Sequence, residues 1–159
     1  MPEAKRGAND NWPGLAGRIT ERVHILPIRV YFEDTDFSGL VYHASYIRWF
    51  ERGRSDFLRL LGVHHSDLIA SGRQQEPAAF VVRRLEVDYR RPARIDEVLE
   101  IHTGCLEIGP VALWLEQTAV RDNDTLCRAR VQVVLVSRSG KPQRLTGLVH
   151  KAFQSVLPN

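Results

Sequence analysis

The chain has 159 residues and a mass of 18.2 kDa, which fits a single domain with a hydrophobic core. Its hydrophobic share of 43% and charged share of 26% are ordinary for a soluble globular protein. The net charge of +3 is too small to indicate nucleic-acid binding, although arginine-rich chains suit anionic small molecules. No apolar stretch is long enough for a membrane span or a secretory signal, so a cytoplasmic location is expected.

The first half of the chain predicts a tail, a strand and a long helix. Residues 1–20 are polar and predict a flexible N-terminal tail. Residues 22–32, RVHILPIRVYF, are mostly β-branched or aromatic and predict a strand, in which Pro27 indicates an edge or a bulge. Residues 43–61 predict the longest helix, because apolar side chains recur at steps of three and four.

Glycines mark special positions in and after this helix. Gly62 is expected to end the helix, and Gly53, in mid-helix, is expected to mark the close approach of another element. A second short helix is predicted over the sequence SDLIASG, residues 66–72.

The second half of the chain predicts strands. Stretches rich in Val, Leu, Ile and Thr cover residues 78–89, 97–107, 112–121 and 126–137. Their short links, including the turns at 109–110 and 122–124, predict a four-strand antiparallel meander. Cys105 and Cys127 fall in these strands and are expected to be buried free thiols. A terminal helix is predicted over residues 144–157.

Together these elements predict an α+β domain in which an antiparallel sheet curls around one helix. Such a sheet has open edges, and pairing of the edges between copies would cover them. A homo-oligomer is therefore expected.

The stretch YFEDTDFSGLVYH, residues 31–43, places acidic side chains between the strand and the long helix. A structural interpretation makes Asp36 a turn former and gives Gly39 a positive φ. A calcium loop is disfavoured, because apolar residues stand where its later oxygen ligands should be. A chemical interpretation is that a carboxylate facing a helix N-terminus can attack a carbonyl group, or activate a water, while the helix amides polarise that carbonyl.

The longer run YFEDTDFSGLVYHASYIRWFERGR closely resembles the signature of hotdog-fold acyl-CoA thioesterases. Specifically, it resembles the 4-hydroxybenzoyl-CoA thioesterase family and its YbgC-type members, which are associated with the Tol–Pal system. The sequence VDYRRPARIDE, residues 87–97, is also similar, and the resemblance covers residues 23–138. It implies a hotdog fold, an antiparallel sheet wrapped around one long central helix, in a single domain over residues 21–159 with a C-terminal helix.

The resemblance also implies site residues. Asp36 matches the catalytic carboxylate, and His43 matches the residue whose backbone N–H polarises the thioester carbonyl. Tyr42 and Glu51 are expected to contact the substrate. Phe32 stands where many YbgC-type sequences carry tyrosine, which leaves open an effect on mechanism.

The remaining charged residues have more than one interpretation. Arg90 and Arg91 precede a proline at a strand end, where they form either a solvated pair or a contact to the phosphates of coenzyme A. His24 is expected to be isolated, and no metal site or cofactor is expected.

The expected activity is hydrolysis of the thioester of acyl-coenzyme A, or of an acyl carrier protein, by a homodimer or homotetramer. A hotdog hydratase or dehydratase and a non-catalytic acyl-binding subunit are the alternatives. The acyl chain length and the choice between nucleophile and general base stay open.

Overall fold

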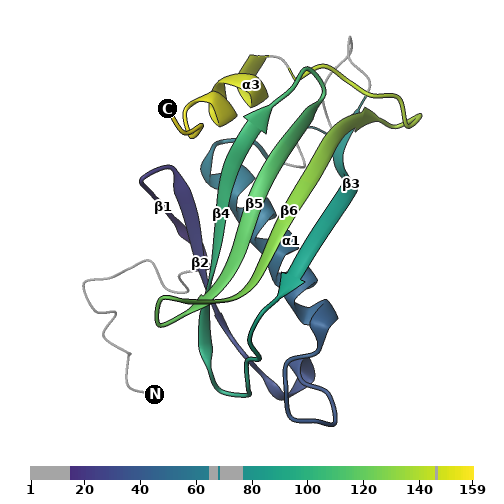
Figure 1. The fold of residues 1–159 in the computed structure, drawn as a ribbon. Coiled ribbons are helices and arrows are strands. Elements are labelled where there is room, and N and C mark those ends of the chain that lie inside the picture. The colour runs from purple at the N-terminus through teal and green to yellow at the C-terminus, as the bar shows by residue number, and fades with distance from the viewer. Residues whose placement is uncertain (1–14, 65–67, 69–76, 146) are drawn as a thin grey trace, which may run out of the picture.

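The computed structural model describes residues 15–64, 68, 77–145 and 147–159. In this part of the chain, a long helix, α1 (His43–Leu60), lies against one face of a single antiparallel sheet (Figure 1). The strands are β1 (Arg18–Thr20), β2 (Val23–Arg29), β3 (Ala78–Tyr89), β4 (Val98–Ile108), β5 (Ala112–Arg121) and β6 (Asp124–Ser137). A 3₁₀ turn, η1 (Phe32–Asp34), precedes α1, and a terminal helix, α3 (Gly147–Gln154), follows the sheet. The predicted α+β class is confirmed.

The strand order is β1-β2-β4-β5-β6-β3, so the predicted four-strand meander is wrong. Only β4, β5 and β6 form a meander, whereas β3 pairs with β6 at the edge of the sheet. The connection from β3 to β4, residues 90–97, therefore crosses three strand spacings, about 14 Å. Eight residues span that distance easily, so a short link did not require neighbouring strands.

The core lies between α1 and the sheet. Alternate residues of β4, β5 and β6 are buried against the helix, as the two-residue period of strands requires. A Cβ atom on Gly53 would lie 3.0 Å from the side chains of both Ile101 and Thr103 on β4. This contact confirms the predicted close approach at Gly53. The largest fully buried apolar side chains of this core include Trp49, Phe50, Phe57, Phe153, Leu99 and Ile101.

The first predicted strand is shorter than expected. β2 ends at Arg29, and Phe32 begins the turn η1 instead of continuing the strand. Pro27 lies beyond β1, which pairs only with residues 23–25, so the missing N–H of Pro27 costs no ladder hydrogen bond on that side. β1 itself lies within the segment that was expected to be a tail.

Several local predictions are confirmed. Gly62 has a φ of +80° and follows Leu61, the C-cap of α1, and the terminal helix is present as α3. Cys105 and Cys127 are buried free thiols. The predicted short helix over residues 66–72 lies almost wholly outside the described residues. The described residues contain no helix with the length and apolar character that crossing a membrane requires.

Candidate active site

The acidic loop folds back on itself as a narrow hairpin in front of α1. The Asp36 N–H donates to the Leu40 carbonyl at 2.9 Å, and the Gly39 N–H donates to the Asp36 carbonyl at 3.0 Å. Gly39 has a φ of +77°, a conformation that glycine adopts without steric cost. The Asp34 carbonyl accepts the Tyr42 N–H at 2.8 Å, which ties the loop to the start of the helix. The turn chemistry of the structural interpretation is therefore present.

The first turn of α1 offers free hydrogen-bond donors. Tyr42 is the N-cap residue, but its side chain makes no capping hydrogen bond, and its ring meets the His43 imidazole edge-on at 4.5 Å between centroids. The Ser45 N–H donates to the Tyr42 carbonyl at 2.9 Å. The N–H groups of His43 and Ala44 have no acceptor within the described residues. Such amides carry partial positive charge and can donate to an oxyanion.

The Asp36 carboxylate has one engaged and one open oxygen. Its Oδ1 accepts the Ser38 N–H at 2.8 Å and the Ser38 hydroxyl, whereas Oδ2 has no hydrogen bond in the described part of the chain. The Ser38 hydroxyl and the Ser38 amide hold the pKa of Asp36 below its ordinary value; desolvation opposes them, and the His43 imidazole adds a smaller lowering. Asp36 is exposed in the single chain. The lowered pKa keeps the Asp36 carboxylate ionised at neutral pH.

A hollow of about 310 Å³ opens beside the start of α1. It is lined by Leu40, Val41, His43, Tyr46, Tyr89, Arg90, Arg91 and Pro92. The Tyr89 hydroxyl donates to the His43 carbonyl at 3.1 Å, and the two rings meet edge-on. The structure therefore brings the predicted residues His43, Arg90 and Arg91 to one hollow.

Both predicted arginines form surface ion pairs. Arg90 Nε lies 2.7 Å from Asp88 Oδ2, and Arg91 Nη1 lies 2.6 Å from Asp124 Oδ2. Both arginines are exposed, as the interpretation of a solvated pair expects, and each also has a carboxylate partner. A guanidinium has five N–H donors, and each arginine uses one of them in its ion pair. The ion pairs therefore leave donors that a phosphate could use.

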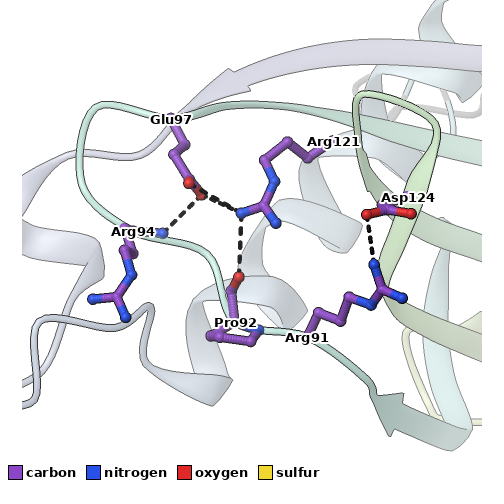
Figure 2. Close-up of polar contacts among 6 residues, drawn as sticks. All are labelled: Arg91, Pro92, Arg94, Glu97, Arg121 and Asp124. Carbon is purple, nitrogen blue, oxygen red and sulfur yellow. Dashed lines mark hydrogen bonds and ion pairs between the residues drawn. The ribbon is translucent and has the colours of Figure 1, made fainter.

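Figure 2 shows a second set of contacts that fixes the connection between β3 and β4. Arg121 Nη1 donates to both carboxylate oxygens of Glu97, at 2.8 and 3.0 Å, and to the Pro92 carbonyl at 3.3 Å. Glu97 Oε2 also accepts the main-chain N–H of Arg94 at 2.9 Å. The sequence offered no signal for this network, because Glu97 and Arg121 are 24 residues apart.

Glu51 does not join the residues at the start of α1. It follows His43 by eight residues, about 12 Å along the helix axis. Its Oε1 accepts the Ser55 hydroxyl at 2.6 Å. Glu51 borders a separate pocket of about 130 Å³ between α1 and the sheet, together with Ser55 and Arg54. The sequence analysis had singled out neither of these two neighbours.

The prediction that His24 is isolated is wrong. His24 is fully buried, and its Nε2 lies 2.7 Å from Asp56 Oδ2 on α1. The same oxygen accepts the Gly17 N–H at 2.7 Å, and Arg59 donates to Oδ1. An aspartate on the apolar face of the predicted helix was the available signal. Within the described residues, no three His, Cys, Asp or Glu side chains are grouped so that they could hold a metal ion.

The thioesterase-like superfamily matches residues 30–153 of the chain. Acyl-CoA thioesterase YbgC of Haemophilus influenzae is 38% identical over 110 residues, which cover 69% of this chain and 78% of that protein. Acyl-CoA thioester hydrolase YbgC of Escherichia coli O157:H7 is 42% identical over 111 residues, which cover 69% and 79%. The crystal structure of a probable thioesterase from Bartonella henselae is 44% identical and superposes with a TM-score of 0.73, over 78% of this chain and 99% of that one. The chain therefore belongs to the thioesterase-like superfamily and has the hotdog fold.

Proposed function

We propose that the chain hydrolyses acyl-coenzyme A thioesters to a carboxylic acid and the free thiol. The observation that carries this proposal is the ionised Asp36 carboxylate, with one open oxygen, on the loop that leads into the free N–H groups of His43 and Ala44. A carboxylate and a pair of amide donors suffice to attack a thioester carbonyl without a serine or cysteine nucleophile. The similarity to YbgC acyl-CoA thioesterases supports the same reaction class.

In the proposed mechanism, the amides of His43 and Ala44 donate to the thioester oxygen as negative charge develops on it. Asp36 supplies the electron pair in one of two ways. It attacks the carbonyl carbon directly and forms a mixed anhydride, which water then hydrolyses, or it takes a proton from a water that attacks. Either way the C–S bond breaks, the thiolate takes up a proton, and one water is consumed.

The test is turnover of purified Asp36→Asn, read as thiol release from acyl-coenzyme A. We expect kcat to fall by roughly a hundredfold or more, because the amide can neither attack nor accept the proton. Glu33→Gln, an exposed acid of the same loop, is the matched control and should keep its activity. Near-normal kcat in Asp36→Asn would contradict the assignment.

Parallel measurement of double-bond absorbance detects the hydratase alternative, and tight acyl-coenzyme A binding without thiol release would indicate the non-catalytic one.

We also propose that the active species is a homodimer or homotetramer in which the β3 edge is covered. β3 has twelve residues, whereas the opposite edge strand, β1, has three. Val81, Val82 and Tyr89 of β3 are 43–48% exposed. An unpaired edge with exposed apolar side chains favours pairing with a second copy. Light scattering should give a multiple of 18.2 kDa, and a fully active monomer would contradict this part of the proposal.

For coenzyme A we propose contacts from its phosphates to the free donors of Arg90 and Arg91. Replacement of both by methionine should raise KM and leave kcat nearly unchanged, since phosphate contacts serve ground state and transition state alike. An unchanged KM would assign the two arginines to their ion pairs alone.

We also propose acyl carrier protein as an alternative carrier, a cytoplasmic location, which the sequence led us to expect, and an association with the Tol–Pal system, which the resemblance implies. Comparing acyl-coenzyme A with the same acyl group on a carrier protein tests the first of them. Cell fractionation and co-purification test the other two.

A further inference from the structure

A small apolar pocket lies between the second half of α1 and the sheet, away from the hollow beside His43. Its volume is about 130 Å³, and its apolar walls include Phe57, Leu58, Phe80, Leu113, Val133 and Phe153. One water occupies about 30 Å³, so the pocket has the volume of about four waters. An apolar space of this size suits a short chain of carbon atoms.

One cationic side chain, that of Arg54, lines this pocket. Arg54 is half-buried, and its Nη1 donates to Gln117 Oε1 at 2.8 Å. Gln117 is fully buried and is itself fixed, because its Nε2 donates to the Phe50 carbonyl at 2.8 Å and to the Thr103 hydroxyl at 2.9 Å. The guanidinium is therefore held in place by a buried, hydrogen-bonded partner.

This guanidinium has no carboxylate partner. Among the described residues, none of the ion pairs includes Arg54. Burial lowers the pKa of Arg54, and the charge of Glu51 opposes that shift only in part. Glu51 is exposed and its Oε1 is engaged by Ser55, so water screens its charge. A partly desolvated cation with free donors is stabilised by an anion, and a carboxylate matches the forked geometry of arginine.

We infer that this pocket binds the acyl group of the substrate and that Arg54 selects acyl groups that end in a carboxylate. The substrate class is then the coenzyme A monothioesters of short dicarboxylic acids, with glutaryl-coenzyme A as the probe. This inference deepens the proposed thioesterase function and rests on it.

A second copy of the chain explains how the pocket meets the chemistry. Within one chain, Arg54 follows His43 by 11 residues, about 16 Å along α1, which a five-carbon acyl group cannot bridge. β3 contributes Phe80 to the pocket and Tyr89 to the hollow beside His43. When the β3 strands of two copies pair antiparallel with their centres aligned, Tyr89 of one copy lies opposite Ala78 of the other. The pocket of one copy then adjoins the hollow of the other.

The test compares glutaryl-coenzyme A with valeryl-coenzyme A, which has the same number of carbons and no terminal charge. Wild-type protein should show the higher kcat/KM for the glutaryl thioester. Arg54→Met should lower the glutaryl-to-valeryl ratio roughly 10- to 100-fold, the loss expected for one charge-assisted hydrogen bond. Arg52→Met, an exposed arginine of the same helix that does not line this pocket, should leave the ratio unchanged.

Two further variants keep the test decisive if Arg54→Met does not fold. Arg54→Lys retains the positive charge but loses the forked geometry of the guanidinium. Its glutaryl-to-valeryl ratio should therefore lie between those of the wild type and Arg54→Met. Glu51→Gln removes the negative charge near Arg54 and should raise the ratio. Mixing Asp36→Asn with an Arg54 variant should restore part of the glutaryl activity, since one of the two shared sites in a mixed dimer is intact.

The outcomes separate the two proposals. A wild-type preference for the valeryl thioester, an unchanged ratio in the Arg54 variants, or no recovery on mixing would overturn the inference. In each of these cases thiol release by the wild type still supports the thioesterase. The absence of thiol release from every acyl-coenzyme A would overturn the proposed function instead.

Discussion

The Asp56 carboxylate joins three parts of the chain, and its replacement is the strongest stability test that the structure offers. It accepts His24 Nε2 of β2 and the Gly17 N–H before β1, each at 2.7 Å, and Arg59 of its own helix. Asp56→Asn keeps the shape of the side chain but replaces one acceptor oxygen with an NH₂ donor. Both buried donors share Oδ2, so the asparagine amide oxygen can take its place only with the NH₂ group turned toward the Arg59 guanidinium, and both buried donors then bond to a neutral acceptor instead of a charged one.

The cost can be worked out from these contacts. Burial alone would raise the pKa of Asp56, but hydrogen bonds from Arg59, His24 and Gly17 outweigh it and leave the pKa below its ordinary value. Arg59 is half exposed, so its ion pair contributes at most about 1 kcal/mol. Each of the two buried bonds, from His24 and Gly17, loses about 1 kcal/mol when its acceptor becomes neutral. We therefore expect Asp56→Asn to lower the free energy of unfolding by about 3 kcal/mol, and Tm by about 6–12 °C for a domain of this length.

Urea unfolding at pH 7 measures this loss, with Asp88→Asn as the control. Asp88 pairs with Arg90 on the surface, so the same substitution there should cost less than about 0.5 kcal/mol. Because folding lowers the pKa of Asp56, its stabilisation is fully present above the ordinary aspartate pKa of about 3.9 and is lost as the pH falls through the lower native value. The gap between wild type and Asp56→Asn should therefore narrow in acid. A gap that widens there, or a loss no larger than that of Asp88→Asn, would refute the reasoning.

Four smaller predictions concern α1 and the loop before it. Gly53→Ala should lower Tm despite the better helix propensity of alanine, because its Cβ would lie 3.0 Å from the Ile101 side chain; a higher Tm would show that the sheet gives way. Gly39→Ala should cost about 1–2 kcal/mol in urea unfolding, since its φ is +77° and alanine is strained there. His43→Ala should lower kcat less than Asp36→Asn, because the backbone amide remains; equal losses would make the imidazole essential. As the pH falls, kcat/KM should drop to half its maximum at a pH below the ordinary aspartate pKa of about 3.9, because the pKa of Asp36 is lowered. A midpoint above about 3.9 would assign the activity to another group.

The sequence predicts best what depends on neighbouring residues. The bounds of α1, β3 and β5 follow from local periodicity, and the predicted ends agree with the structure to within one residue. The fold of the acidic loop is also local, since its hydrogen bonds join residues 34–42 to one another. Strand order depends instead on pairing between distant segments, which is why the predicted position of β3 was wrong.

The same limit applies to side chains that meet across the fold. His24 and Asp56 are 32 residues apart, and Arg54 and Gln117 are 63 residues apart. Each residue alone is an ordinary member of a strand or a helix. Only the packing of α1 on the sheet turns them into a buried pair and a charged pocket wall.

The pairing of β3 with β6 bears on the order in which the molecule is assembled. β4, β5 and β6 are joined by tight turns, so each of these strands can pair with the one synthesised just before it. β3 is synthesised before all of them but finds its partner only when β6 is complete. During that interval on the ribosome, its twelve residues have no ladder to join, and their apolar side chains are open to capture by another nascent chain. The edge that we expect to hold two finished copies together is thus also the segment most in need of protection while each copy is being made.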